Sequence, residues 1–86
     1  MPAYTATVRV RLKEGVLDPE ATTTRRALER LDYDVDDLRR ADQFELEFDA
    51  ESVTAAEDAA QEMTERLLAN PTIHDYDVSV EERGEA

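Results

Sequence analysis

Cysteine is absent from this chain of 86 residues, and glycine occurs only twice. Without cysteine there can be no disulfide, no thiolate zinc site and no cysteine nucleophile, so the chain cannot itself be a cysteine-dependent glutaminase. With only Gly15 and Gly84, neither a phosphate-binding loop nor a dinucleotide fingerprint can be formed. The sequence therefore offers no thiol chemistry and no nucleotide-binding motif.

Metal-ligating and catalytic patterns are equally scarce. His74 is the sole histidine, so it lacks the partners that zinc binding or a catalytic triad requires. The alternating aspartates of residues 32–36 resemble the start of a calcium loop, but Asp37 and Gln43 stand where that loop needs glycine and glutamate. Carboxylate pairs occur throughout the chain and single out no acid and base. We therefore expect no catalytic residue, no metal and no cofactor in this chain.

Long hydrophobic runs are also missing. No apolar segment is long enough to span a membrane, and no charged-then-apolar signal opens the chain, so we expect a cytoplasmic protein without a membrane partner. A chain of this length buries roughly 60–65% of its unfolded surface. Because such a core is modest, association into oligomers is a common source of extra stability.

Positive charge is in short supply, with 10 basic residues against 22 acidic ones and a net charge of −12. Lys13 is the only lysine, and the acidic residues are spread along the chain. This pattern is typical of a protein from a salt-rich cytosol, where a Debye length of about 3 Å at 1 M screens self-repulsion. A rival interpretation is an acidic protein that binds a basic partner, but the charge forms no single block. Without a basic face we expect no binding to nucleic acid.

Three segments have the alternation of half-buried strands. Residues 4–12 place one apolar set on one face, residues 44–48 repeat the pattern, and a final strand follows residue 75. The inward residues are Tyr4, Ala6, Val8, Val10 and Leu12, then Phe44, Leu46 and Phe48, then Tyr76, Val78 and Val80.

Two segments have the spacing and end signals of helices. The first is predicted from Asp18, a strong N-cap followed by Pro19 at the first helical position, to about Leu31. The second is predicted to open on a capping box at residues 54–57 and to end at Asn70-Pro71. Their predicted apolar stripes are Leu17, Ala21, Thr24, Leu28 and Leu31 in the first, and Ala56, Ala60, Met63 and Leu67 in the second.

This order predicts a single α+β domain over residues 1–86, with a core of about 4–82 and a frayed tail at 83–86. Two helices would pack on one face of a three- to four-stranded antiparallel sheet related to the ferredoxin-like arrangement. Residues 35–41 either extend the second strand or form a hairpin partner for it. The open face would carry Arg9 and Arg11 beside acidic residues of the neighbouring strands.

Two stretches carry a family resemblance. A strand ending in Leu12-Lys13 runs into the turn Val16–Pro19, and a long helix ends in Leu67–Asn70 before Asp75-Tyr76 opens the last strand. In these features residues 4–82 resemble the PurS family, the small non-catalytic subunit of phosphoribosylformylglycinamidine (FGAM) synthase in purine biosynthesis. The chain departs from the family at Ala21, where a glycine is common, and at Ala41-Asp42, where Gly-Lys is common.

The resemblance implies a subunit that bridges separate glutaminase and synthetase chains and supports ammonia transfer between them. ATP and Mg²⁺ would then be used by the partner synthetase, in a glutamine-dependent ligase complex, and the chain would be a homodimer or tetramer. Candidate interface residues are Lys13, Asp18, Pro19 and Tyr76, which lie on the matching motifs at element ends. The alternative is a stand-alone ferredoxin-like regulatory or metabolite-binding module.

Overall fold

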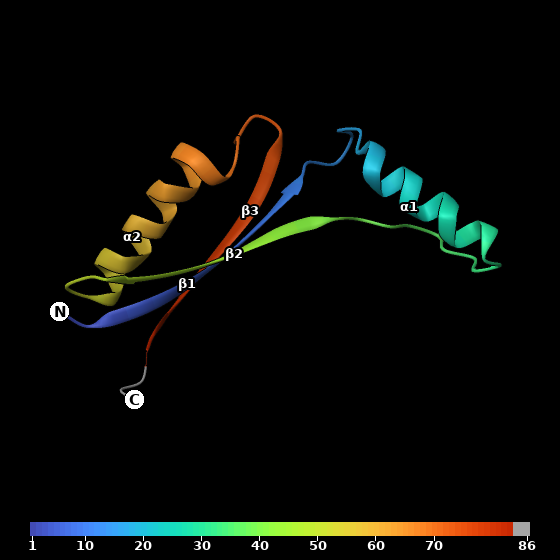
Figure 1. Ribbon diagram of the computed structural model, residues 1–86. Helices are drawn as coiled ribbons and strands as arrows, with labels where there is room; N and C mark the ends of the chain where they lie inside the picture. Colours follow the sequence, from blue (N-terminus) through green and yellow to red (C-terminus); the bar gives the residue numbers. More distant parts are fainter. Residues whose placement is uncertain (84–86) are drawn as a thin grey trace.

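A three-stranded antiparallel sheet forms the centre of the protein in the computed structural model, which describes residues 1–83 (Figure 1). The order of elements is β1 (Ala3–Leu12), α1 (Pro19–Arg30), β2 (Ala41–Asp49), α2 (Val53–Met63), a π-helical turn η1 (Thr64–Leu68) and β3 (His74–Glu82). The predicted α+β class, with two helices and an antiparallel sheet, is confirmed.

β1 is the central strand, in the order β2-β1-β3. Val8 pairs with Phe44 on one side and with Val78 on the other, and this register runs the length of the strand. Because alternate residues of a strand share a face, the apolar residues of all three strands meet on one face, as their alternation predicts. α2 lies along this face and contacts β3 and β1.

α2 begins two residues earlier than the sequence predicts. Its N-cap is Ser52, whose hydroxyl accepts the Ala55 backbone N–H at 3.1 Å. The prediction that Thr54 opens a capping box is therefore wrong. Ser52 can reach the N–H of the third helical residue from an extended backbone, which leaves Thr54 inside the first turn.

The apolar stripe of α2 also differs from the predicted one at its C-terminal half. Ala56 and Ala60 are fully buried as expected, and the next buried residue is Thr64, whose hydroxyl donates to the Ala60 carbonyl at 2.8 Å. Met63 is 36% exposed and Leu67 is 84% exposed. Steps of four residues place position 64 against the sheet, and its satisfied hydroxyl removes the cost of burying it.

α1 does not lie on the sheet beside α2. Figure 1 shows it beyond the far end of β1 and β2, and within residues 1–83 the helix–sheet packing is made by α2. The prediction that two helices pack on one face of the sheet therefore holds for α2, whereas α1 projects away from the sheet. Gly15 lies between β1 and α1 with φ +87°, a backbone conformation that favours glycine and turns the chain out of the sheet.

The segment that follows α1 is neither part of β2 nor a hairpin partner for it, so both predictions for residues 35–41 are wrong up to Ala41, where β2 begins. α1 ends instead in a Schellman motif, with the Asp32 N–H donating to Glu29 O and the Tyr33 N–H to Leu28 O, each at 3.0 Å. Asp32 has φ +70°. This residue therefore serves to end the helix, and residues 33–40 return the chain to the sheet.

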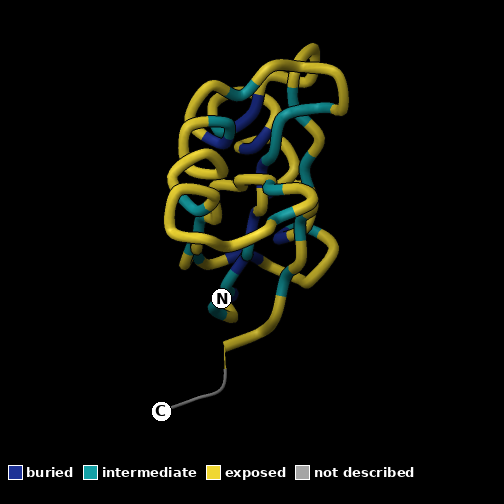
Figure 2. Tube along the Cα trace, turned by 90° about the vertical axis from the view of Figure 1, so that its right-hand side faces the viewer, coloured by how far each residue is buried: buried dark blue, intermediate teal, exposed yellow. Residues whose placement is uncertain are grey.

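Most buried residues lie in β1 and on the inner side of α2 and η1, with Ala50 and Ala69 in the adjoining segments and Ala21 as the buried residue of α1 (Figure 2). The largest fully buried side chains are Val8 and Thr64, and the inward residues of the edge strands are half-buried. The core is therefore small even for this length. At the end of the described chain the Arg83 N–H donates to Ala3 O at 2.8 Å, and residues 84–86 of the predicted tail lie outside the described residues.

Candidate functional site

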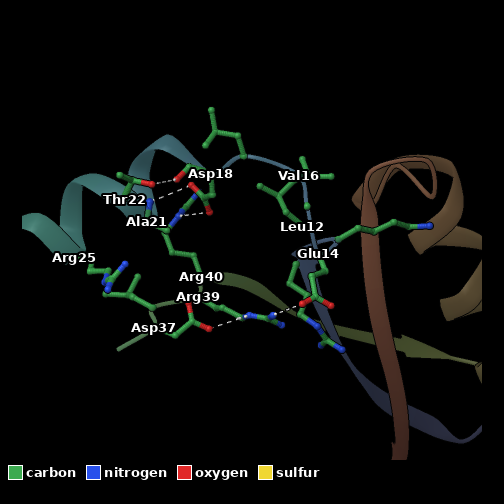
Figure 3. A pocket seen from close by; sticks show the side chains of 15 residues that line it. Leu12, Glu14, Val16, Asp18, Ala21, Thr22, Arg25, Asp37, Arg39 and Arg40 are labelled. Atoms are coloured by element: carbon green, nitrogen blue, oxygen red, sulfur yellow. Dashed lines mark hydrogen bonds and ion pairs between the residues drawn. The ribbon is translucent and has the colours of Figure 1, made fainter. Parts of the chain in front are cut away.

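A pocket lies where α1 leaves the sheet. It is formed by the end of β1 and the turn after it (residues 11–18), by the first turns of α1, and by residues 37–40 before β2 (Figure 3). We call it the α1-base pocket. Three of the four predicted interface residues lie at or beside it: Lys13 and Asp18 line it, and Pro19 is the first residue of α1.

Asp18 fixes the start of α1. One of its carboxylate oxygens accepts the backbone N–H groups of Glu20 and Ala21, each at 3.1 Å, and the other accepts from Arg40 Nε at 3.3 Å. These donors, the Ala21 N–H above all, together with Arg40, hold the pKa of the Asp18 carboxyl below its ordinary value. The predicted N-cap is confirmed, and it also ties α1 to the segment before β2.

Arg39 and Arg40, which the sequence patterns did not indicate as functional residues, also line the pocket. Arg39 lies between Glu14 and Asp37, with its guanidinium nitrogens 3.8 and 3.5 Å from their carboxylates (Figure 3). Arg40 contacts Asp18 and, at 3.1 Å, Glu20. The signal that could have revealed them is their position as an arginine pair just before β2 in a chain poor in basic residues.

The charge around the pocket is mixed. Half of the ten basic residues of the chain line it, but acidic residues lie among them, and Arg39 and Arg40 are each paired with two carboxylates. Arg25 donates to the Val35 carbonyl at 2.9 Å. These pairings suit a polar contact surface for another protein better than a cradle for a small anion. The basic residues are Arg11, Lys13, Arg25, Arg39 and Arg40.

The loop before β3 approaches the same end of the sheet. The Lys13 N–H donates to Ile73 O at 2.8 Å, and the Asn70 N–H donates to His74 Nδ1 at 2.9 Å. The two stretches that carry the family resemblance are therefore adjacent in space. His74 acts as a structural acceptor at the entry of β3, in keeping with its place in the sequence.

Tyr76 lies apart from the other predicted interface residues. Its hydroxyl donates to Glu65 Oε1 at 2.7 Å, and Gln61 Nε2 contacts both that oxygen and the Tyr76 hydroxyl, at 2.8 and 2.9 Å. The Tyr76 hydroxyl and the Gln61 amide lower the pKa of Glu65, and the hydrogen bond to Glu65 raises the pKa of Tyr76. The structure thus places Tyr76 where it ties β3 to η1.

Within the described part of the chain, no group of three His, Asp or Glu side chains is arranged to hold a metal ion. The helices of residues 1–83 include none with the length and hydropathy needed to cross a membrane.

Comparison with known proteins gives a consistent result. The family model described as PurS, phosphoribosylformylglycinamidine (FGAM) synthase, matches residues 5–82. The phosphoribosylformylglycinamidine synthase subunit PurS of Methanothermobacter thermautotrophicus is 49% identical over 75 residues, covering 87% of this chain and 89% of that protein.

Solved structures agree in fold. The crystal structure of Methanocaldococcus jannaschii PurS, a subunit of formylglycinamide ribonucleotide amidotransferase, matches with a TM-score of 0.83 and 38% identity, covering 94% of this chain and 99% of that one. A chain in the structure of PurLQS from Thermotoga maritima matches with a TM-score of 0.85 and 30% identity, covering 94% of this chain and 100% of that one.

Proposed function

This chain belongs to the PurS family of FGAM synthase subunits, and from that premise we propose that it bridges the glutaminase and synthetase subunits of the enzyme and supports ammonia transfer between them. The observation that carries the proposal is the match to a whole chain of the PurLQS structure from Thermotoga maritima. The work of this subunit in purine biosynthesis is then assembly.

The chemistry is assigned to the partners. Release of ammonia from glutamine by a thiol needs a cysteine, which this chain lacks. ATP and Mg²⁺ are used by the synthetase, since the two glycines here cannot build a phosphate-binding loop. The complex as a whole, in the cytoplasm, is the glutamine-dependent ligase.

We assign the partner contact to the α1-base pocket, through Lys13, Asp18 and Pro19. The Lys13 and Asp18 side chains belong to one surface formed by three segments of the chain, and Pro19 adjoins it. Its mixed charges favour a specific orientation of a protein partner, because each misplaced charge would be left without its opposite. Tyr76 supports this surface indirectly, by tying β3 to η1.

We also propose that the subunit is a homodimer or tetramer. α1 has little contact with its own sheet, and a helix of 12 residues is marginal in water without tertiary packing. A symmetric oligomer provides that packing from a second copy.

Reconstitution of the complex tests the bridging function. Omitting this chain should abolish glutamine-dependent synthesis, while synthesis from added ammonia should partly survive, because ammonia from solution needs no bridge. Equal synthesis from glutamine with and without the chain would overturn the proposal. Specific binding of a small metabolite to the isolated chain, without any effect on synthesis, would instead favour a stand-alone regulatory module.

Two variants separate contact from folding in the same assay. Lys13→Ala should lower glutamine-dependent synthesis and leave unfolding unchanged, because the Lys13 side chain makes no hydrogen bond or ion pair within residues 1–83. Asp18→Ala removes the N-cap as well and should therefore lower both synthesis and helix stability.

A further inference from the structure

The α1-base pocket has an apolar lining inside its charged walls. Val16 and Leu17 are 37% and 78% exposed, and Leu12 and Leu38 are half-buried. Exposed apolar side chains that are scattered singly need no explanation, but several that meet in one concavity mark a contact site. The apolar side chains of the lining come from three segments of the chain and belong to Leu12, Val16, Leu17, Ala21 and Leu38.

The volume of the pocket limits what it can hold. The pocket encloses about 250 Å³, which is below the range of roughly 300–1,000 Å³ that is usual for sites of drug-sized ligands and cofactors. It is also much larger than the roughly 30 Å³ that one water molecule occupies in the liquid. A space of this size fits one large side chain of another protein.

The arginines around this lining already have partners. Arg39 and Arg40 are each paired with two carboxylates of the pocket wall. A small anion would have to compete with these carboxylates, whereas a protein partner can cover the pairs without leaving an arginine unpaired. An apolar centre within a rim of paired charges is the usual anatomy of a protein–protein contact.

Lys13 differs from the other basic residues that line the pocket. Those residues are all arginines in ion pairs, whereas the Lys13 side chain makes no hydrogen bond or ion pair within residues 1–83. The backbone of Lys13 is fixed, because its N–H donates to Ile73 O at 2.8 Å. A free ammonium group held beside an apolar pocket favours a partner that brings a carboxylate.

We infer that the α1-base pocket receives one large apolar side chain from an enzyme subunit that this chain bridges, and that an acidic residue beside that side chain pairs with Lys13. The inference rests on the proposed bridging function and specifies the chemistry of the contact. Large side chains seated in such pockets contribute most of the binding energy of protein interfaces, while the contacts around them exclude water.

The wall of the pocket is held by the chain's own hydrogen bonds. The Val16 N–H closes the turn at Gly15 by donating to Lys13 O at 3.0 Å, and the Asp18 carboxylate fixes the first turn of α1. Arg40 links that turn to the segment before β2. An entering side chain therefore has to order little of this chain, which favours binding.

Filling the pocket tests the inference in the reconstituted complex. Thr22 lines the pocket and Thr23 does not, although both are in the first turns of α1 and both hydroxyls donate to a carbonyl four residues earlier. Thr22→Phe should raise the concentration of this chain needed for half-maximal glutamine-dependent synthesis at least about tenfold, because the partner's side chain can no longer be buried. Thr23→Phe, the matched control, should change that concentration less than about threefold.

Both variants should stay folded, because phenylalanine and threonine have similar helix propensities. Circular dichroism and sedimentation check the fold and the oligomeric state. A folded Thr22→Phe chain that acts at the wild-type concentration would overturn the inference and leave bridging intact. Equal synthesis from glutamine with and without the wild-type chain would overturn bridging itself.

A charge reversal tests the contact of Lys13 separately. Lys13→Glu should raise the same concentration at least about tenfold in molar salt, because two carboxylates would then meet. Arg26→Glu makes the same change in net charge at an exposed position of α1 outside the pocket, and should raise it less than about threefold. Since the Debye length of about 3 Å at 1 M leaves only direct contacts, equal effects of the two reversals would contradict the inferred pair.

Photo-cross-linking identifies the occupant of the pocket. Because the chain has no native cysteine, Leu17→Cys can carry a single benzophenone label at the edge of the pocket. Irradiation of the assembled complex should link this label to an apolar residue next to an aspartate or glutamate of the glutaminase or the synthetase, as peptide mapping by mass spectrometry would show. A link to a second copy of this chain, or to a site without a neighbouring carboxylate, would overturn the inference.

Discussion

The direction of α1 depends on two backbone positions at its ends, and exchanging their residue types should shift stability in opposite directions. Gly15 has φ +87° and Asp32 has φ +70°. Glycine adopts this region without steric cost, whereas an L-residue with a Cβ is strained there. We therefore expect Gly15→Ala to destabilise the protein and Asp32→Gly to stabilise it.

The magnitudes follow from the local geometry. A Cβ on Gly15 would meet no atom within 4 Å, so the cost is the backbone strain alone. That strain is about 1–2 kcal/mol and is offset by about 0.4–1 kcal/mol from a less flexible unfolded chain, leaving roughly 0.5–1 kcal/mol. Asp32→Gly releases a similar backbone strain and removes a carboxylate from the negative end of α1, and both effects stabilise the fold. The greater flexibility of glycine in the unfolded chain offsets part of this, which leaves a net gain of roughly 0.5–1 kcal/mol.

Urea unfolding at fixed protein concentration measures both changes in the free energy of unfolding. In thermal unfolding the melting temperatures of the two variants should differ by roughly 4–16 °C. Asp34→Gly is the matched control: the same substitution at a position without positive φ should give no stabilisation. Destabilisation by Asp32→Gly together with no effect of Gly15→Ala would refute the assignment of α1's direction to these two residues.

Four further predictions concern charge and chemistry. The pKa values of Asp18 and Glu65 are depressed, so both carboxylates stabilise the fold above their ordinary pKa of about 4, and this stabilisation should be lost as the pH falls through the depressed values; Glu65→Gln should flatten the acid limb of a stability–pH curve. The raised pKa of Tyr76 predicts the opposite limb, a loss of stability above about pH 10 that Tyr76→Phe should remove. The melting temperature should rise between low and molar salt, and a flat or falling value would argue against adaptation to salt. The purified chain should show neither glutaminase nor ATP-dependent ligase activity, and turnover free of contaminating subunits would contradict the bridging proposal.

The sheet and the start of α1 could be predicted because their determinants are local. The alternation over residues 4–12 places all the apolar side chains of β1 on one face of the sheet. The register then follows, because β2 and β3 must place their apolar residues on that same face. The Asp18 cap needs only the two N–H groups that follow it. The N-cap of α2 was mispredicted because Ser52 and Thr54 are both capable caps, and the choice depends on where the chain leaves β2.

The position of α1 could not be predicted from the sequence. The apolar stripe of a helix predicts that this face packs against something, but it does not identify the packing partner. The apolar residues Leu17 and Leu31 fit an intramolecular helix–sheet layer as well as an intermolecular one. The α1-base pocket could not be predicted from the sequence pattern either. Arg39 and Arg40 pair with Glu14 and Asp18, which are distant in the sequence and meet them only in the folded chain. Thr64 was missed for a different reason: its buried hydroxyl bonds within its own helix and so behaves as an apolar residue.

The same geometry explains why salt should stabilise a chain that contains several ion pairs. The ion pairs within residues 1–83 engage eight carboxylates, of the 22 acidic residues in the chain. Exposed pairs contribute about 0–1 kcal/mol each, so screening them costs little. Repulsion among the many other carboxylates is screened at the same time, and the direction of α1 is kept by the Gly15 turn and by backbone hydrogen bonds, which salt does not weaken. Salt should therefore raise the stability of the folded chain, and it should also weaken the repulsion between acidic copies in the proposed oligomer.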